Sequence, residues 1–277
     1  MSSSACATIR IVRPSVVVLF ALVLLPAGLR AQDALGESRR LYNAGEFEAA
    51  ERAARVALAQ PASANSARVV LGRINLERYR KTPSSTFLTD ARTALREVDP
   101  VALDARERIE LTLGLAETLF LEDRFAAAAQ MFAPVLEASN TLGVAAHERV
   151  LDWWATALDR HAQTRGMAER PAIYGRIVER MTAELAHDAG SIPAGYWLVA
   201  AARGSGDLDA AWSAATAAWV RAVLGRDRGV ILRGDLDRLV VHAIIPERAA
   251  RLSPRDPSLA LTGLLSDWEA FKASWTR

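Results

Sequence analysis

Arginine side chains are the residues of this sequence whose type and spacing best suit the binding of a ligand. Arg39 and Arg73 lie 34 residues apart. A guanidinium holds a carboxylate through two parallel hydrogen bonds, so the pair could bind an acidic peptide or the carboxylate at a chain end. Tyr42 belongs to the same segment as Arg39, and Glu117 reverses the charge in a later segment. We therefore expect Arg39, Tyr42, Arg73 and Glu117 on a partner-binding surface; the alternative is that the arginines are ordinary solvated residues.

Patterns typical of catalysis or metal binding are missing from the sequence. His147, His161, His187 and His242 are scattered, and no histidine pair has the spacing of a zinc motif. There is no phosphate-binding loop, no nucleophile elbow and no dinucleotide fingerprint. The one cysteine, Cys6, lies close to the N-terminus. We expect no catalytic residue, no metal ligand and no cofactor, and thus a non-enzymatic protein.

Aromatic side chains offer an alternative site in the second half of the sequence. All seven tryptophans lie there: Trp153, Trp154, Trp197, Trp212, Trp219, Trp268 and Trp275. Trp212 and Trp219 are seven residues apart, so they share one face of a helix and could stack on a sugar or a peptide. Core packing is the competing interpretation of these rings. A ligand-binding protein, a sugar-binding protein or an enzyme with its site in this half remains the alternative function.

The first 31 residues have the order of a secretory signal peptide. Arg10 and Arg13 form a basic start, residues 16–25 are an unbroken apolar run, and small Ala31 ends the segment. The run of about ten residues is half the length that a membrane-spanning helix needs. We therefore expect cleavage after residue 31 and a periplasmic or secreted protein.

An uncleaved anchor is the alternative for this segment, but Pro26 ends the apolar run early. Cys6 precedes the run, whereas a lipoprotein needs its cysteine directly after it, so we expect no lipid anchor. Removing residues 1–31 takes away three arginines and no acid. The formal charge then falls from +2 to 31 basic minus 32 acidic residues, which is −1. This balance gives no reason to expect a nucleic-acid partner, and we expect no membrane insertion of the mature chain.

Helical spacing dominates the remaining sequence, and three of its turns are alike. Leucines at 111, 115 and 119 recur every four residues, whereas alternating strand patterns are nearly absent. The turns are "NAGEF" (43–47), "LEDRF" (121–125) and "GSGDL" (204–208), and each ends in a large apolar residue. Small or apolar residues follow at offsets of three, seven and ten: Ala50, Ala54 and Ala57; Ala128, Phe132 and Val135; Ala211, Ala215 and Ala218. These matched offsets predict helical hairpins in which the second helix packs closely on the first.

These segments resemble tetratricopeptide repeats, which are helix–turn–helix units of about 34 residues. The matching positions of the first unit are Leu41, Tyr42, Gly45, Phe47, Ala50, Ala54 and Pro61, although the leading tryptophan of the family pattern is missing. The resemblance implies an all-α, right-handed α-solenoid of about five hairpins over residues 32–224. It also implies that the first helix of each unit lines a concave face. Residues 225–277 are expected to form a helical cap, with one helix starting at Asp235 and another over 259–275.

A binding or scaffolding role follows from this resemblance. We expect an exported bacterial protein that presents a concave surface to a protein or peptide partner. The sequence gives no identity for the partner and no oligomeric state. A self-assembling envelope array that stacks through the C-terminal helix is a further alternative.

Overall fold

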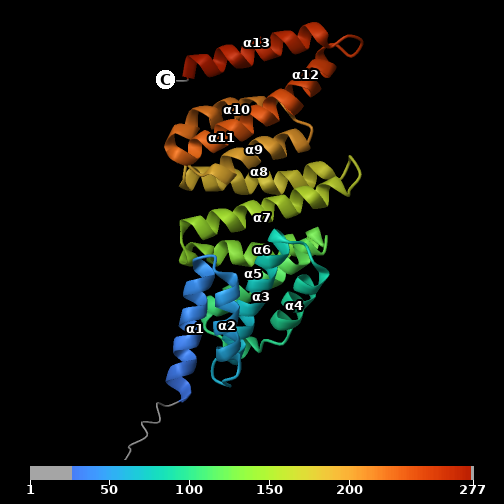
Figure 1. The fold of residues 1–277 in the computed structure, drawn as a ribbon. Helices are drawn as coiled ribbons and strands as arrows, with labels where there is room; N and C mark the ends of the chain where they lie inside the picture. Colours follow the sequence, from blue (N-terminus) through green and yellow to red (C-terminus); the bar gives the residue numbers. More distant parts are fainter. Residues whose placement is uncertain (1–26, 276–277) are drawn as a thin grey trace, which may run out of the picture.

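The computed structural model describes residues 27–275, and the secondary structure of this part is helical, with no strand in it. The predicted signal peptide lies mostly outside the described residues, since the first helix begins at Ala27. Figure 1 shows an elongated molecule with the first helices at one end and α13 at the other. The α-helices are α1 (Ala27–Asn43), α2 (Phe47–Leu58), α3 (Ala64–Lys81), α4 (Ser85–Arg96), α5 (Ala105–Leu121), α6 (Phe125–Ala138), α7 (Val144–Gln163), α8 (Arg170–His187), α9 (Ile192–Gly204), α10 (Leu208–Arg221), α11 (Asp227–Leu239), α12 (Ile245–Leu252) and α13 (Ser258–Trp275). The all-α prediction is confirmed for these residues.

Helices that follow one another in the chain pack side by side. Contacts join α1 with α2, α3 with α4, α5 with α6, α7 with α8, and α9 with α10, and further contacts join each of these pairs to the next. The odd-numbered helices also touch one another, α1 with α3 and α3 with α5, and then α7 with α9 and α9 with α11. Between α5 and α7 the connection runs mainly through α6, which packs on both. The row of odd-numbered helices therefore opens between α5 and α7.

The three turns that look alike in sequence have the same backbone structure. Gly45, Asp123 and Gly206 all have positive φ angles, of 78°, 58° and 88°. In each turn the N–H of this residue donates to the carbonyl three residues back, and the next N–H donates to the carbonyl five residues back, as Asp207 does to Ala202 at 3.0 Å. This pair of bonds ends a helix by the Schellman arrangement. The sequence prediction of three equivalent turns is thus confirmed.

The predicted small-residue stripes are buried in all three segments. Ala50, Ala54 and Ala57 have no exposed surface, and the other six stripe residues are at most 2% exposed. The large residue that ends the turn packs back on the preceding helix, since the Phe47 ring lies 5.7 Å from Tyr42 and the Phe125 ring 5.4 Å from Phe120. Small side chains on the stripe let the paired helices approach closely.

The C-terminal region differs from the prediction at one helix start. Asp235 does not begin a helix: α11 begins at Asp227, and Asp235 lies inside it and pairs with Arg238. The helical path continues through a π-turn (η4, Val240–Ile244) into α12. Leu232, Leu236 and Val240 are buried and form one stripe. Because packing of this stripe stabilises the helix N-terminal to Asp235, the helix does not begin at the possible cap there. The predicted last helix over 259–275 is confirmed as α13, which packs on α10 and α12.

Candidate functional site

A groove of about 420 Å³ lies where the row of odd-numbered helices opens. Its walls come from α1, the turn after α1, α3, α5 and α7, and a small hollow that includes Arg39 adjoins it. The lining residues are Tyr42, Asn43, Gly45, Phe47, Arg73, Glu77, Arg106, Glu110, Leu113, Ala146, Arg149, Val150 and Trp153. Segments more than 100 residues apart in the chain thus form one surface.

The predicted arginines lie at this groove, but each is paired with a glutamate of α5. Arg39 contacts Glu107 at 2.5 Å, and Arg73 contacts Glu110 at 3.6 Å. Glu107 and Glu110 are at most 9% exposed, so their charges depend on these partners. The arginines are therefore not free: Arg73 is largely buried, Arg39 is part-exposed, and the two connect α3 and α1 to α5.

Glu117 is buried behind the groove and does not line it. Its carboxylate accepts a hydrogen bond of 2.7 Å from Arg80, and Arg80 also pairs with Glu77 at 3.0 Å. Burial raises the pKa of Glu117 above its usual value, although the charges of Arg80 and Arg73 act to lower it. Three arginine–glutamate pairs, Arg39–Glu107, Arg73–Glu110 and Arg80–Glu117, therefore form a ladder along α5, which we call the α5 ladder.

Aromatic rings support the guanidiniums of this ladder. The Arg73 guanidinium lies 4.7 Å from the centre of the Tyr42 ring, and that of Arg80 lies 4.6 Å from the Trp153 ring. Cations are attracted to the face of such rings. Burial raises the pKa of Tyr42 to about 12, so its hydroxyl stays protonated at neutral pH. Tyr42 and Trp153 thus bring apolar surface and fixed cations together in one groove.

Two arginines of the groove are more available to a ligand. Arg106 is exposed and shares Glu110 with Arg73, at 3.2 Å. Arg149 is exposed on α7 and has no carboxylate partner within residues 27–275. Sequence reasoning missed both, although Arg106 follows Arg73 by 33 residues, close to the repeat length. Matching the segments by their turns pointed to Glu117 instead of Arg106. Which position of a helix reaches the groove depends on how far the packed helices are shifted along one another. The sequence alone does not give this shift.

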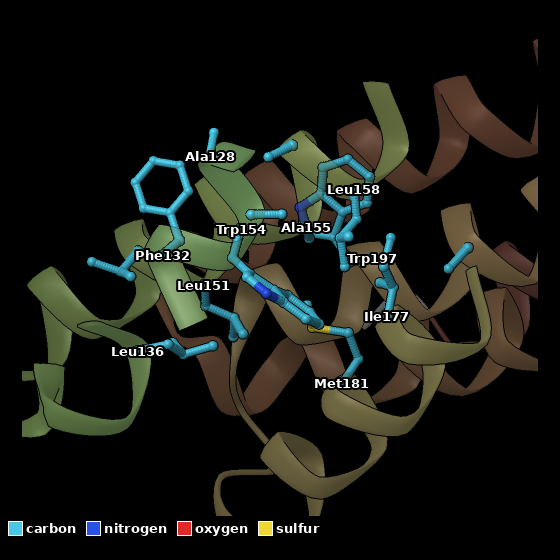
Figure 2. Close-up of a cluster of buried hydrophobic side chains, with 14 of the residues drawn as sticks. Ala128, Phe132, Leu136, Leu151, Trp154, Ala155, Leu158, Ile177, Met181 and Trp197 are labelled. Atoms are coloured by element: carbon cyan, nitrogen blue, oxygen red, sulfur yellow. The ribbon is translucent and has the colours of Figure 1, made fainter. Parts of the chain in front are cut away.

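Most of the tryptophans belong to cores. Trp154 and Trp197 lie among the packed side chains between α6, α7, α8 and α9 (Figure 2). Trp219 and Trp268 are buried in a second cluster, where their ring centres lie 5.5 Å apart. Half-buried Trp212 packs edge-on against Trp268 at 5.7 Å. Core packing is thus the interpretation that fits Trp212 and Trp219, and α13 covers the surface that the alternative of a stacking platform would need.

A second hollow, of about 640 Å³, lies between α7, α8, α9 and α12. Tyr174, Tyr196 and Trp197 line it, and of these only Tyr196 is more than slightly exposed. Arg170 and Arg251 also line it; each donates to backbone carbonyls and has no carboxylate partner in the described part of the chain. Asp159 and Glu247 line the hollow as well, so the Trp-rich half contains a hollow with aromatic walls and charges of both signs.

Within the described range, no three or more His, Cys, Asp or Glu side chains are arranged so that they could hold a metal ion. The same range has no helix whose length and apolar character would let it cross a membrane.

Comparison of the chain with protein-family models, with curated proteins and with solved structures finds no match. The function must therefore be inferred from the groove and its charges.

Proposed function

We propose that this chain is an exported, non-enzymatic binding or scaffolding protein whose groove takes a segment of a protein or peptide partner. In this proposal, residues 32–224 form a right-handed α-solenoid of about five tetratricopeptide-like hairpins, and residues 225–277 form its cap. The single observation that carries the proposal is the opening between α5 and α7, which is lined by the first helix of four successive hairpins. Concave surfaces of this kind are typical binding surfaces of helical repeat proteins.

The chemistry of the groove favours an extended segment with an acidic group. The lining carries three arginines, Arg73, Arg106 and Arg149, against two glutamates, Glu77 and Glu110. Arg73 is largely buried and engaged by Glu110, so a ligand carboxylate would bind first to Arg149. Arg106 also contacts Glu110, but its side chain is exposed enough to reach the ligand as well. The half-exposed Trp153 ring offers an apolar contact beside them.

The test is capture of the partner with the tagged full-length protein from envelope extracts, followed by mass spectrometry. The affinity of the captured partner is then measured for Arg149→Ala and Trp153→Ala. We expect each change to weaken binding by about tenfold, because each removes a direct contact. Arg160→Ala is the matched control, since Arg160 is an exposed arginine of the same helix that does not line the groove. Unchanged affinity in both groove variants would reject the groove as the site.

The hollow in the Trp-rich half supports a second candidate, the binding of a small molecule or sugar that carries an anionic group. The supporting observation is that half-buried Tyr196 lines the same hollow as Arg170 and Arg251, which have no carboxylate partners among the described residues. Screening of anionic sugars by intrinsic tryptophan fluorescence tests it, since Trp197 lies in the wall. A response that survives Tyr196→Ala combined with Arg251→Ala would assign the ligand to another place.

A further inference from the structure

Four large apolar side chains are exposed within nine residues of sequence, at the corner between α10 and α11. Val223 and Leu224 lie in the short 3-10 helix η3 (Ala222–Gly225), and Val230 and Ile231 lie in the first turns of α11. Their exposed fractions are 68%, 57%, 73% and 63%. We call these four residues the apolar corner; in Figure 1 it lies at the outer edge of the stack of helices.

The apolar corner is a packed structure. Gly229 lies so close to the backbone of Ala222 that a Cβ there would overlap its carbonyl oxygen. A Cβ on Gly225 would lie 2.6 Å from the Cδ1 of Ile192, the end of a flexible side chain. Beneath the corner, Ala222 and Leu232 are buried in the core that includes Trp268. The four aliphatic side chains are therefore held outward by a well-anchored turn.

Arginines surround the apolar corner. Exposed Arg226 and Arg228 lie between its two halves, and half-buried Arg221 and Arg233 flank it, whereas Asp227 is the one acid between residues 221 and 233. Arg228 is paired with buried Glu148, and exposed Asp188 lies nearby on the next loop. The four arginines and three acids give this region a small positive net charge, although the charges of the whole chain are nearly balanced.

We propose that the apolar corner docks the protein onto an anionic lipid surface. The four aliphatic side chains enter the boundary between headgroups and acyl chains, and exposed Arg226 meets a lipid phosphate. A lipid surface suits this corner better than a protein does. Four aliphatic side chains cover much less than the roughly 800 Å² that each partner contributes to a standard protein interface. This docking is independent of what binds in the groove.

The first test is sedimentation of the exported protein with vesicles of phosphatidylcholine, with and without an equal part of phosphatidylglycerol. We expect stronger binding to the anionic vesicles. Val230→Ser combined with Ile231→Ser should weaken binding about tenfold or more, because two apolar anchors are lost. The control is Val56→Ser combined with Val101→Ser, two aliphatics exposed by 58% and 87% elsewhere. Arg226→Gln should weaken binding about fivefold, and only on anionic vesicles.

A local readout on the uncleaved full-length chain separates the corner from the apolar run at residues 16–25, which every full-length variant shares. Leu224→Cys in a Cys6→Ser background is labelled with a polarity-sensitive fluorophore, and Val101→Cys is the reference position. We expect a blue shift on anionic vesicles at residue 224 and none at residue 101. No shift at residue 224 overturns the proposal. So does a concentration-dependent dimer in light scattering that the Val230→Ser, Ile231→Ser variant abolishes, because the corner would then contact a second copy of the chain.

Discussion

Leu95 projects from α4 into the space that two glycines leave open, Gly72 on α3 and Gly114 on α5. A Cβ on Gly72 would lie 2.5 Å from the Leu95 Cγ, and a Cβ on Gly114 would lie 3.1 Å from its Cδ1. Leu95 is 2% exposed, so it has little room to move. This one leucine thus fixes the spacing of α3, α4 and α5, and α3 and α5 line the groove.

Gly72→Ala tests this contact. We expect the free energy of unfolding to fall by about 1–3 kcal/mol, because the added methyl group overpacks Leu95. Gly36→Ala is the matched control in α1, where a Cβ would meet no atom within 4 Å. There the higher helix propensity of alanine should raise stability by up to about 1 kcal/mol. Urea unfolding measures both, and a gain in stability for Gly72→Ala would show that the contact is loose.

Asp237 joins α11 to α13 and provides a prediction for pH. It accepts hydrogen bonds from the Trp268 indole at 2.8 Å and from Lys272 at 2.6 Å. Burial alone would raise the pKa of Asp237, but the two hydrogen bonds together with the charges of Lys272 and His242 outweigh burial and hold the pKa below its usual value. A lowered pKa stabilises the fold above the unfolded-state pKa of about 3.9, and this contribution is lost as the pH falls through the folded-state pKa.

Asp237→Asn should therefore lower the free energy of unfolding by about 1 kcal/mol at neutral pH. The difference from the unchanged protein should shrink as the pH falls below about 4, where Asp237 becomes protonated. Asp235→Asn is the control, since its partner Arg238 is exposed and both lie on the surface of α11. Thermal unfolding followed over a pH series measures the effect. A difference that stays constant with pH would mean that the ionised carboxylate contributes nothing.

At the scale of elements, features set by a few consecutive residues could be predicted from the sequence, whereas features set by packing between helices could not. The three turns could be predicted because a Schellman ending depends on a few consecutive residues, such as Gly45 and the Phe47 that follows it. The start of α11 could not, because burial of Leu232 and Leu236 favours helix before Asp235. The presence of Arg106 in the groove likewise depends on helix stagger, which only the packed structure defines.

The positive φ angles of the turns predict that exchanging side chain and glycine changes the free energy of unfolding in opposite directions at two equivalent positions. Asp123 holds φ at 58° where the equivalent position of the third turn is Gly206 at 88°. A side chain in this region costs about 1 kcal/mol, so Asp123→Gly should raise the free energy of unfolding by roughly that amount and Gly206→Ala should lower it. Gly166→Ala, at a loop glycine without positive φ and with open space around it, is the control. Chemical denaturation checks all three variants. If the free energy of unfolding changed in the same direction at positions 123 and 206, the two turns would not be equivalent.

At the scale of the molecule, contacts join mostly near neighbours along the stack. The first core cluster spans α5 to α9, the second spans α9 to α13, and two smaller clusters hold α1 to α5. The α5 ladder adds charge pairs between α1, α3 and α5 at one end. In such an arrangement each part should depend chiefly on the helices next to it, as in an array of repeats.

Trp268→Ala tests this view of the whole molecule. Trp268 is fully buried and packs against Trp212 and Trp219 of α10. Its loss leaves a large cavity under α13, so amide hydrogen exchange should become faster in α10 to α13 by the equivalent of about 3–5 kcal/mol. Exchange in α3 to α5 should be unchanged, because no core cluster connects Trp268 to those helices. Trp275→Ala, at a ring that is 52% exposed on the same helix, should alter neither region. If exchange rose equally at both ends, the stack would unfold as one cooperative unit, and the α-solenoid proposal would lose its basis.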